Sequence, residues 1–298
     1  MFRTQTWAIP GLLIAALGML PAATVGSAPS SDDLKLADAV KAGDIAIVNS
    51  LIARKVNVNA PQADTSTPLH WAVERNDVEM ARALIAAGAD VKAKTRYNIT
   101  PIALAAKNGS AQIIEMLLKA GVDANSTSED GQSALMTAAL NGKVDAVKML
   151  LTHGANVNAV EPYKGQTALM WAAGQGNADA AAMLVEFGGS LKAKSKAGFT
   201  PLLFAVLNNR IEAAKVLIKL GANIEDAAPD GTTALNMAAV NAYYDLASVL
   251  LIWARTRMLP MRADPRCIRW CGCVSQAPRG RPLVWRKIPI RSRVPMAM

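Results

Sequence analysis

The chain has 298 residues, of which 52% are hydrophobic, 18% charged and 5% aromatic, and its formal net charge is +9. From Leu251 onward there are 11 Lys and Arg residues and one acidic residue, which leaves 21 basic and 22 acidic residues before it. All three cysteines also follow Leu251. The main body is therefore near neutral, which argues against nucleic-acid binding by it, and it contains no cysteine for a disulfide.

The N-terminus has the features of a secretory signal peptide. Arg3 precedes the apolar stretch AIPGLLIAALGML, and the small residues of PAATVGSA predict cleavage near Ser27 or Ala28. Pro21 ends the apolar run short of the roughly 20 residues that a membrane span needs. We therefore expect residues 1–28 to direct export to the periplasm or beyond the cell. A retained N-terminal membrane anchor is the alternative.

Two short motifs then recur in phase. The first is TPLHWA at Thr67, followed by TPIALA, SALMTA, TALMWA, TPLLFA and TALNMA at Thr100, Ser133, Thr167, Thr200 and Thr233, with spacings of 33, 33, 34, 33 and 33 residues. The second is centred on glycine, at Gly88, Gly121, Gly154, Gly188 and Gly221. Two series in phase over five periods indicate a repeat protein in which each unit packs on its neighbours.

The residues of one unit predict two helices. Thr67 can cap a helix through its hydroxyl, and Pro68 is favoured at the first helical position because it needs no N–H partner there. DVEMARALIAAG predicts a second helix that begins after the acidic cap Asp77 and ends at Gly88, which can adopt a left-handed conformation. The stretches EDGQ, YKGQ, KAGF and PDGT are typical of turns between units.

These motifs resemble those of the ankyrin-repeat family, here of an exported bacterial type, whose unit of about 33 residues carries a T-P-L-H-x-A box. The resemblance implies an all-α solenoid of about seven helix-turn-helix units joined by short β-turn or hairpin loops. We place the domain at residues 29–253, with units near 31–60, 61–94, 95–125, 126–159, 160–194, 195–226 and 227–253. The first unit lacks the box, as expected of a terminal cap.

The pattern stops at Trp253, and we predict a basic, disordered tail over residues 254–298. Reading the codons of Trp253 and Ala254 one nucleotide early gives glycine, which the repeat requires at this point. We therefore interpret the tail as the product of a frameshift within an ankyrin repeat. Unit seven then lacks the glycine that ends its second helix, and no eighth unit covers DLASVLLIW, so we expect this end to fray.

No catalytic, cofactor-binding or metal-binding constellation is predicted. The resemblance implies that His70 braces neighbouring turns through hydrogen bonds, and His153 has the position of an exposed residue at a helix end. Cys267, Cys271 and Cys273 lack the second group of ligands that a zinc site needs. We therefore expect a non-enzymatic protein with no cofactor, metal or small-molecule substrate.

In ankyrin-like stacks the residue after the fourth box position faces the concave surface, which here predicts Trp71, Leu104, Thr137, Trp171, Phe204 and Met237. Three residues later come Glu74, Lys107, Leu140, Gly174, Leu207 and Val240, so this face becomes more apolar toward the later units. The predicted partner-binding residues, including three aromatics at turn tips, are Trp71, Tyr97, Leu104, Leu140, Tyr163, Trp171, Phe199, Phe204, Leu207 and Met237. The alternative is that these side chains pack on their neighbours within the stack.

The resemblance implies a monomeric scaffold that binds an unidentified protein through its concave face and turn tips. One alternative is an exported regulator or inhibitor of a partner enzyme. Another is the binding of an anionic ligand, nucleic acid or membrane, through the basic tail. Nucleic acid is disfavoured because out-of-frame translation of GC-rich DNA also yields arginines. Membrane association through the N-terminus is expected only if residues 1–28 are retained.

Overall fold

The computed structural model describes residues 31–258, and within this range the chain forms seven helix pairs. The first helices are α1 (Ser31–Ala42), α3 (Pro68–Glu74), α5 (Pro101–Asn108), α7 (Ala134–Leu140), α9 (Ala168–Gln175), α11 (Pro201–Leu207) and α13 (Ala234–Val240). The second helices are α2 (Ile45–Ala53), α4 (Val78–Ala86), α6 (Ala111–Lys119), α8 (Val144–Thr152), α10 (Ala178–Glu186), α12 (Ile211–Lys219) and α14 (Tyr244–Met258). The predicted all-α solenoid of repeated helix pairs is confirmed.

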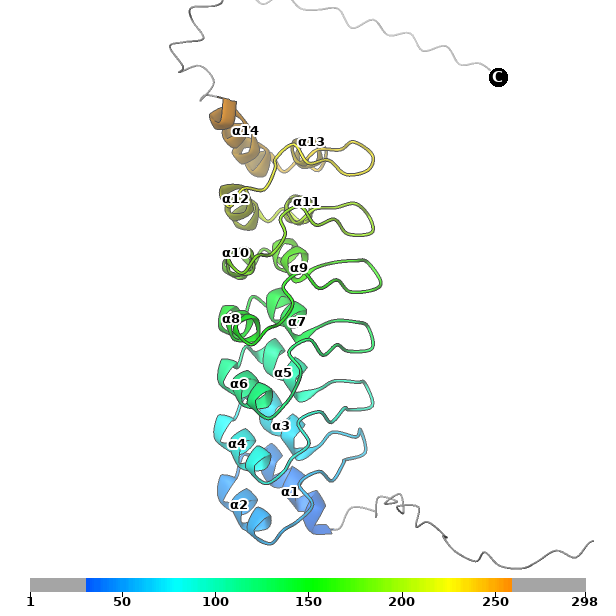
Figure 1. Cartoon of the computed structure of the whole chain (residues 1–298), viewed down its shortest axis with the longest axis vertical. Helices are drawn as coiled ribbons and strands as arrows, with labels where there is room; N and C mark the ends of the chain where they lie inside the picture. The colour runs from blue at the N-terminus through cyan, green and yellow to red at the C-terminus, as the bar shows by residue number, and fades with distance from the viewer. Residues whose placement is uncertain (1–30, 259–298) are drawn as a thin grey trace, which may run out of the picture. The chain divides into compact units, whose positions relative to one another are not determined.

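The helix pairs up to Leu251 belong to one compact part of the chain, and a second part begins at Ile252. In the part of the chain up to Leu251, the first helices of the pairs form one column and the second helices form another. The loops between pairs project beyond the first helices (Figure 1). Each helix packs on its counterparts in the adjacent pairs, as α9 does on α7 and α11. The predicted signal segment at 1–28 and the predicted tail from residue 259 onward lie outside the described residues.

The box residues begin the first helices as their chemistry predicts. The hydroxyls of five box residues accept the backbone N–H three residues later, at 3.2–3.5 Å: Thr100, Ser133, Thr167, Thr200 and Thr233. Asp44 and Asp77 cap α2 and α4 in the same way, at 3.0 and 2.9 Å. Such caps satisfy amides that a helix start otherwise leaves without a partner, and they place the box side chains that follow on a fixed face of the stack.

Glycine follows the second helices of units two to six. Gly88 follows α4 with φ +88°, and Gly188 follows α10 with φ +88°, a left-handed conformation in which a Cβ atom would be strained. A Cβ built on either residue would meet no atom within 4 Å. Glycine is therefore favoured at these two positions by the backbone conformation and not by crowding, although Lys55 adopts the same left-handed conformation after α2, with φ +58°.

The last second helix is longer than those before it. Helices α4, α6, α8, α10 and α12 each have nine residues, whereas α14 has 15 and continues to Met258, five residues past the predicted domain end at 253. No glycine stands where the earlier units stop. Since neither glycine nor proline interrupts the chain there, the helix continues. None of the helices within residues 31–258 is both long and apolar enough to cross a lipid bilayer.

The core of each unit lies between its two helices and those of the next unit. Fully buried leucines recur at equivalent positions in the second helices: Leu84, Leu117, Leu150, Leu184, Leu217 and Leu250. The described range contains no continuous strand, and the turn loops are closed by three isolated β-bridges, Thr127 to Ser133, Val160 to Thr167 and Ala227 to Thr233. The loops are therefore short hairpin-like tips on a helical core.

Asparagine side chains connect the loops of successive units. Asn125 Nδ2 donates to the carbonyl of Gly154 at 3.1 Å, and its Oδ1 accepts the N–H of Asn156 at 2.7 Å. Asn59 and Asn158 make the same pair of bonds to the units that follow them. These bonds cross from unit to unit, so they stabilise the stacking rather than any single helix pair.

Other side chains cover the last carbonyls of the preceding unit's first helix. Asn177 Nδ2 donates to the carbonyls of Ala139 at 2.9 Å and Leu140 at 2.8 Å. Arg75, Asn108 and Arg210 bond carbonyls in the same region of the preceding units. The C-terminal carbonyls of a helix lack partners within it, so each of these helix ends is completed by the next unit.

Candidate protein-binding surface

The predicted partner-binding residues of the first helices follow the fourth box position or lie three residues later, and most of their side chains are accessible. Trp71, Leu104, Trp171 and Phe204 are half-buried, and Leu207 is exposed. Met237 is only 5% exposed, so the expectation that it lies on an accessible face is wrong. The repeat period places it on the correct side of α13, but its flexible side chain lies against the stack rather than projecting from it. We leave Met237 out of the candidate surface.

Three of the predicted residues line one hollow, which we call the proximal hollow. It has a volume of about 250 Å³ and lies between the turn tips and first helices of units two and three, lined by Asp64, Ser66, His70, Trp71, Glu74, Thr95, Tyr97, Ile99 and Leu104. The Tyr97 side chain is 66% exposed at the tip. Arg96 lies over its ring, 4.9 Å from the centroid, and donates to its hydroxyl at 2.8 Å. The tip therefore presents an aromatic side chain held by its neighbour.

Four further predicted residues line a second hollow, which we call the distal hollow. Its volume is about 490 Å³, and it lies between units five and six, lined by Tyr163, Lys164, Gln166, Ser195, Lys196, Ala197, Phe199, Phe204 and Leu207. The rings of Phe199 and Phe204 lie 5.8 Å apart at 49°, a tilted arrangement typical of aromatic pairs. Tyr163 is 68% exposed at the rim. The hollow therefore has an apolar, aromatic lining that opens at the turn tips.

Leu140 and Trp171 line neither hollow, and the two tryptophans of the candidate surface differ in their hydrogen bonding. Trp71 Nε1 donates to Gln62 Oε1 at 3.1 Å, whereas Trp171 Nε1 is buried without a partner. Gln62 and Glu161 occupy equivalent loop positions, because the backbone N–H of each donates to the carbonyl of the residue that precedes the TPLHWA-type box. Glu161 turns its side chain into its own loop, so Trp171 is left without an acceptor.

Glu161 organises the tip that forms one side of the distal hollow. Its buried carboxylate accepts the backbone N–H groups of Tyr163 at 2.7 Å, Lys164 at 2.8 Å and Gln166 at 3.1 Å. Burial alone would raise the pKa of Glu161, but these N–H groups, with the charge of Lys196, outweigh it and hold the pKa below its usual 4.5. A charged, internally bonded Glu161 therefore sets the positions of Tyr163 and Lys164.

His70 connects two units, as the resemblance implies. Its Nδ1 accepts the backbone N–H of Thr67 at 3.2 Å, so Nε2 carries the proton and donates to the carbonyl of Ile99 at 3.1 Å. Burial lowers the pKa of His70 from 6.5, against the raising effect of the Ile99 carbonyl. The neutral ring therefore holds the Ile99 tip against α3, and the bracing role is confirmed.

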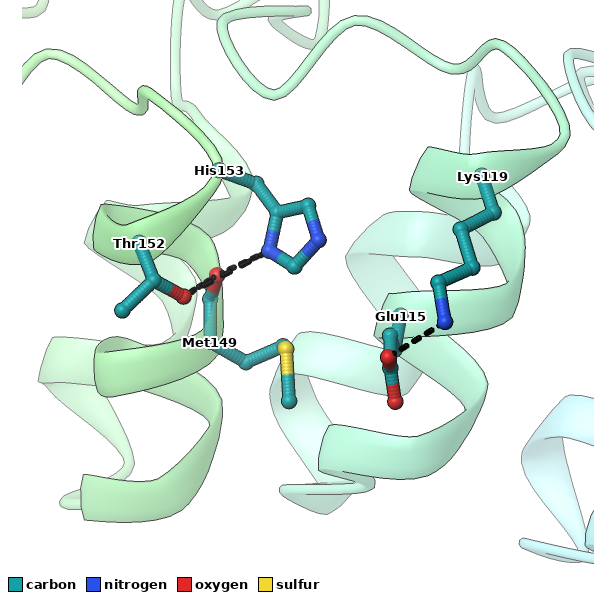
Figure 2. Close-up of polar contacts among 5 residues, drawn as sticks. All are labelled: Glu115, Lys119, Met149, Thr152 and His153. Atoms are coloured by element: carbon teal, nitrogen blue, oxygen red, sulfur yellow. Dashed lines mark hydrogen bonds and ion pairs between the residues drawn. The ribbon is translucent and has the colours of Figure 1, made fainter.

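His153 is an exposed residue at the end of α8, as predicted. Its Nδ1 donates to the carbonyl of Met149 at 2.9 Å, and the Thr152 hydroxyl donates to the same carbonyl at 2.9 Å. Figure 2 shows these bonds beside the Lys119–Glu115 ion pair of α6, at 2.6 Å. The hydrogen bond from Lys119 is the main cause of the lowered pKa of Glu115. These groups close helix ends and turns, and they form no arrangement for acid–base chemistry.

Within residues 31–258 no three His, Cys, Asp or Glu side chains come together in a way that could hold a metal ion. The cysteines at 267, 271 and 273 lie outside the described residues. The sequence analysis missed the two lysines of the distal hollow, Lys164 and Lys196. Lys164 occurs in the turn segment YKGQ and Lys196 in the turn segment KSKAGF, each close to the aromatic residue of its tip. A lysine close to an aromatic residue in two successive turns is the sequence pattern that could have predicted these two lysines as site residues.

Comparison with known proteins agrees with this architecture. The family model described as ankyrin repeats (3 copies) matches residues 36–128, 102–195 and 187–256. Among solved structures, the chain is similar to the crystal structure of the human ASB11 ankyrin repeat domain, with 29% sequence identity and a TM-score of 0.66. That similarity covers 73% of this chain and 96% of the other. No curated protein sequence matches significantly.

Proposed function

Since this chain belongs to the ankyrin-repeat family, whose members act as protein–protein interaction scaffolds, we propose that it holds one partner protein along the proximal hollow, Leu140, Trp171 and the distal hollow. One observation carries the proposal. Seven of the ten residues predicted from the sequence line two hollows that occupy the same place within the repeat, between a turn tip and a first helix. An apolar surface with polar residues at its edge is typical of partner-binding sites.

The test is affinity capture with the full chain and a matched pair of triple variants. The first variant carries Tyr97→Ala, Tyr163→Ala and Leu207→Ala, all exposed residues of the candidate surface. The control carries Ile47→Ala, Phe187→Ala and Leu220→Ala, exposed apolar residues in or at the end of second helices. We expect the first variant to lose the captured protein and the control to retain it, with both melting near the wild type. Equal capture by the two variants would remove the basis for placing the partner here.

We further propose that the protein is exported, and that it acts as a regulator of its partner, such as an enzyme, without catalysing a reaction. The support for export is the sequence of residues 1–28 alone. An alkaline phosphatase reporter fused after residue 30 is active only if the segment is translocated. The mass of the purified protein then separates cleavage near Ser27 from a retained anchor. Intracellular, inactive reporter would reject export.

The basic tail supports a second candidate, the binding of an anionic ligand. Eleven Lys and Arg residues after Leu250, against one acid, are the observation that favours it. A chain that ends at Leu251 separates the candidates. If partner capture is unchanged, the repeats carry the function. If the only measurable binding is to nucleic acid or anionic vesicles and it disappears with the tail, the tail carries it.

A further inference from the structure

The distal hollow combines an apolar lining with positive charge at its rim. Phe199, Phe204 and Leu207 form the apolar part, while Lys164 and Lys196 come from the two turn tips that border it. A volume of about 490 Å³ falls within the roughly 300–1,000 Å³ of sites that enclose small ligands or single side chains. The hollow is therefore large enough to take up a side chain of a partner segment.

The two lysines are available to a ligand. Both side chains are exposed, and neither takes part in an ion pair within the described part of the chain. Lys196 donates to the carbonyl of Pro162, which keeps its ammonium at the rim. Glu161 interacts electrostatically with Lys196, but it is buried and its oxygens accept backbone N–H groups of its own loop. With only 4% of its surface exposed, Glu161 offers little of its carboxylate to a ligand.

The proximal hollow has a mixed character, because acidic residues line it while the Lys41 ammonium lies 4.2 Å from the centre of the Trp71 ring. Asp64 and Glu74 lie among its lining residues, and Glu74 pairs with Lys107 at 3.4 Å. The distal hollow is lined by two lysines and no carboxylate, so of the two hollows it is the one that favours an acidic ligand. Complementary charge of this kind determines which ligand is accepted and how it is oriented more than it raises raw affinity.

We propose that the distal hollow binds an extended acidic segment of the partner protein, in which an aromatic or large aliphatic side chain is flanked by carboxylates. The apolar side chain enters between Phe199, Phe204 and Leu207, and the flanking carboxylates pair with Lys164 and Lys196. This inference rests on the proposed function and names the chemistry of the partner at one end of the surface.

The test uses the full chain and three dye-labelled, end-blocked pentapeptides, followed by fluorescence polarisation. They are Asp-Glu-Phe-Glu-Asp, its lysine counterpart Lys-Lys-Phe-Lys-Lys, and Asp-Glu-Ala-Glu-Asp. We expect the first to bind at least about tenfold more tightly than either of the others, because each control lacks one of the two complementary features. Its affinity should fall as salt rises from about 0.05 to about 0.5 M, since the rim charges are screened.

Charge reversal provides the matched protein variants. Lys164→Glu with Lys196→Glu should reverse the preference toward the lysine peptide. Lys192→Glu with Lys194→Glu makes the same change in net charge at exposed lysines outside the hollow and should leave the preference unchanged. If the reversal variant fails to fold, Lys164→Gln with Lys196→Gln removes both charges while keeping a donor for the Pro162 carbonyl, and the preference for the acidic peptide should then disappear.

Three outcomes would overturn the inference. They are equal binding of the acidic and lysine peptides, an equal loss in the Lys192 and Lys194 control, and binding of a single-stranded DNA oligonucleotide with the same dependence on Lys164 and Lys196. If the peptides fail while the Tyr97, Tyr163 and Leu207 variant still loses the captured protein, the scaffold function stands and only the acidic segment is rejected. If capture is also insensitive to that variant, both are rejected.

Discussion

The asparagine bonds between loops predict a stability difference that two single substitutions can isolate. Asn125 makes two hydrogen bonds to unit four, to the Gly154 carbonyl at 3.1 Å and from the Asn156 N–H at 2.7 Å. Lys92 occupies the equivalent position one unit earlier, because its backbone N–H donates to Asp90 Oδ1 at 2.8 Å as that of Asn125 donates to Asp123 Oδ1 at 2.9 Å. The exposed side chain of Lys92 makes no hydrogen bond within the described residues. Both residues lie in loops, so helix propensity does not enter the comparison.

The expected cost follows from the number of bonds and their exposure. A net hydrogen bond contributes about 0.5–1.5 kcal/mol, and these two are exposed, so the groups left behind by Asn125→Ala can bind water. We therefore expect Asn125→Ala to lower the free energy of unfolding by about 1–2 kcal/mol. Lys92→Ala should change it by less than about 0.5 kcal/mol, as is usual for surface substitutions.

Urea unfolding followed by far-ultraviolet circular dichroism measures the difference. The midpoint should fall for Asn125→Ala with little change in slope, because the surface exposed on unfolding is nearly the same. Asn125→Asp offers a further check, since it keeps an acceptor for the Asn156 N–H but loses the donor to the Gly154 carbonyl. If Lys92→Ala and Asn125→Ala shift the midpoint equally, the bonds between loops do not stabilise the stack.

Three further predictions use residues compared above. Trp71→Phe should cost about 1–2 kcal/mol because it breaks the bond to the Gln62 side chain, whereas Trp171→Phe should be near neutral, since it removes a buried N–H that has no partner; equal costs in chemical denaturation would contradict this. Ile218→Ala should cost about 2–4 kcal/mol at a site 7% exposed, while Leu251→Ala, at the equivalent site 53% exposed, should cost far less; similar melting temperatures for the two variants would show that the last unit is covered after all. His70 has a lowered pKa, so the unfolded chain binds its proton first and stability should fall as pH drops below about 6.5; a His70→Gln variant with the same slope between about pH 7.5 and 5.5 would refute that assignment.

The regular part of the fold could be predicted from the sequence because its signals are local. The box at Thr67 and the glycine at Gly88 each act within one or two helical turns, and the helix pairs begin and end where these residues require. The end of α14 at Met258 could not be derived from the repeat, because the pattern marks only where the motif stops, and neither glycine nor proline follows Trp253 before Pro260.

The candidate site was predictable only in part. Periodicity assigns a residue to a face of its helix, which was sufficient to predict that Trp71 and Phe204 would lie near the tips. It does not show whether the neighbouring structure covers that side chain, and Met237 is buried for this reason. The pairing of Lys164 with Lys196 depends on two tips from different units meeting at one hollow. That is a property of the stack and not of either segment.

The glycines after the second helices also offer a use in protein chemistry. At Gly88, Gly121, Gly154, Gly188 and Gly221 the backbone has the sign of φ preferred by mirror-image amino acids. D-alanine introduced at Gly188 by chemical ligation should therefore adopt the native φ without strain and stabilise the protein by up to about 1 kcal/mol, because it restricts the unfolded chain. D-cysteine at the same five positions would carry fluorescent dyes one repeat apart, and their signals would report which units unfold first.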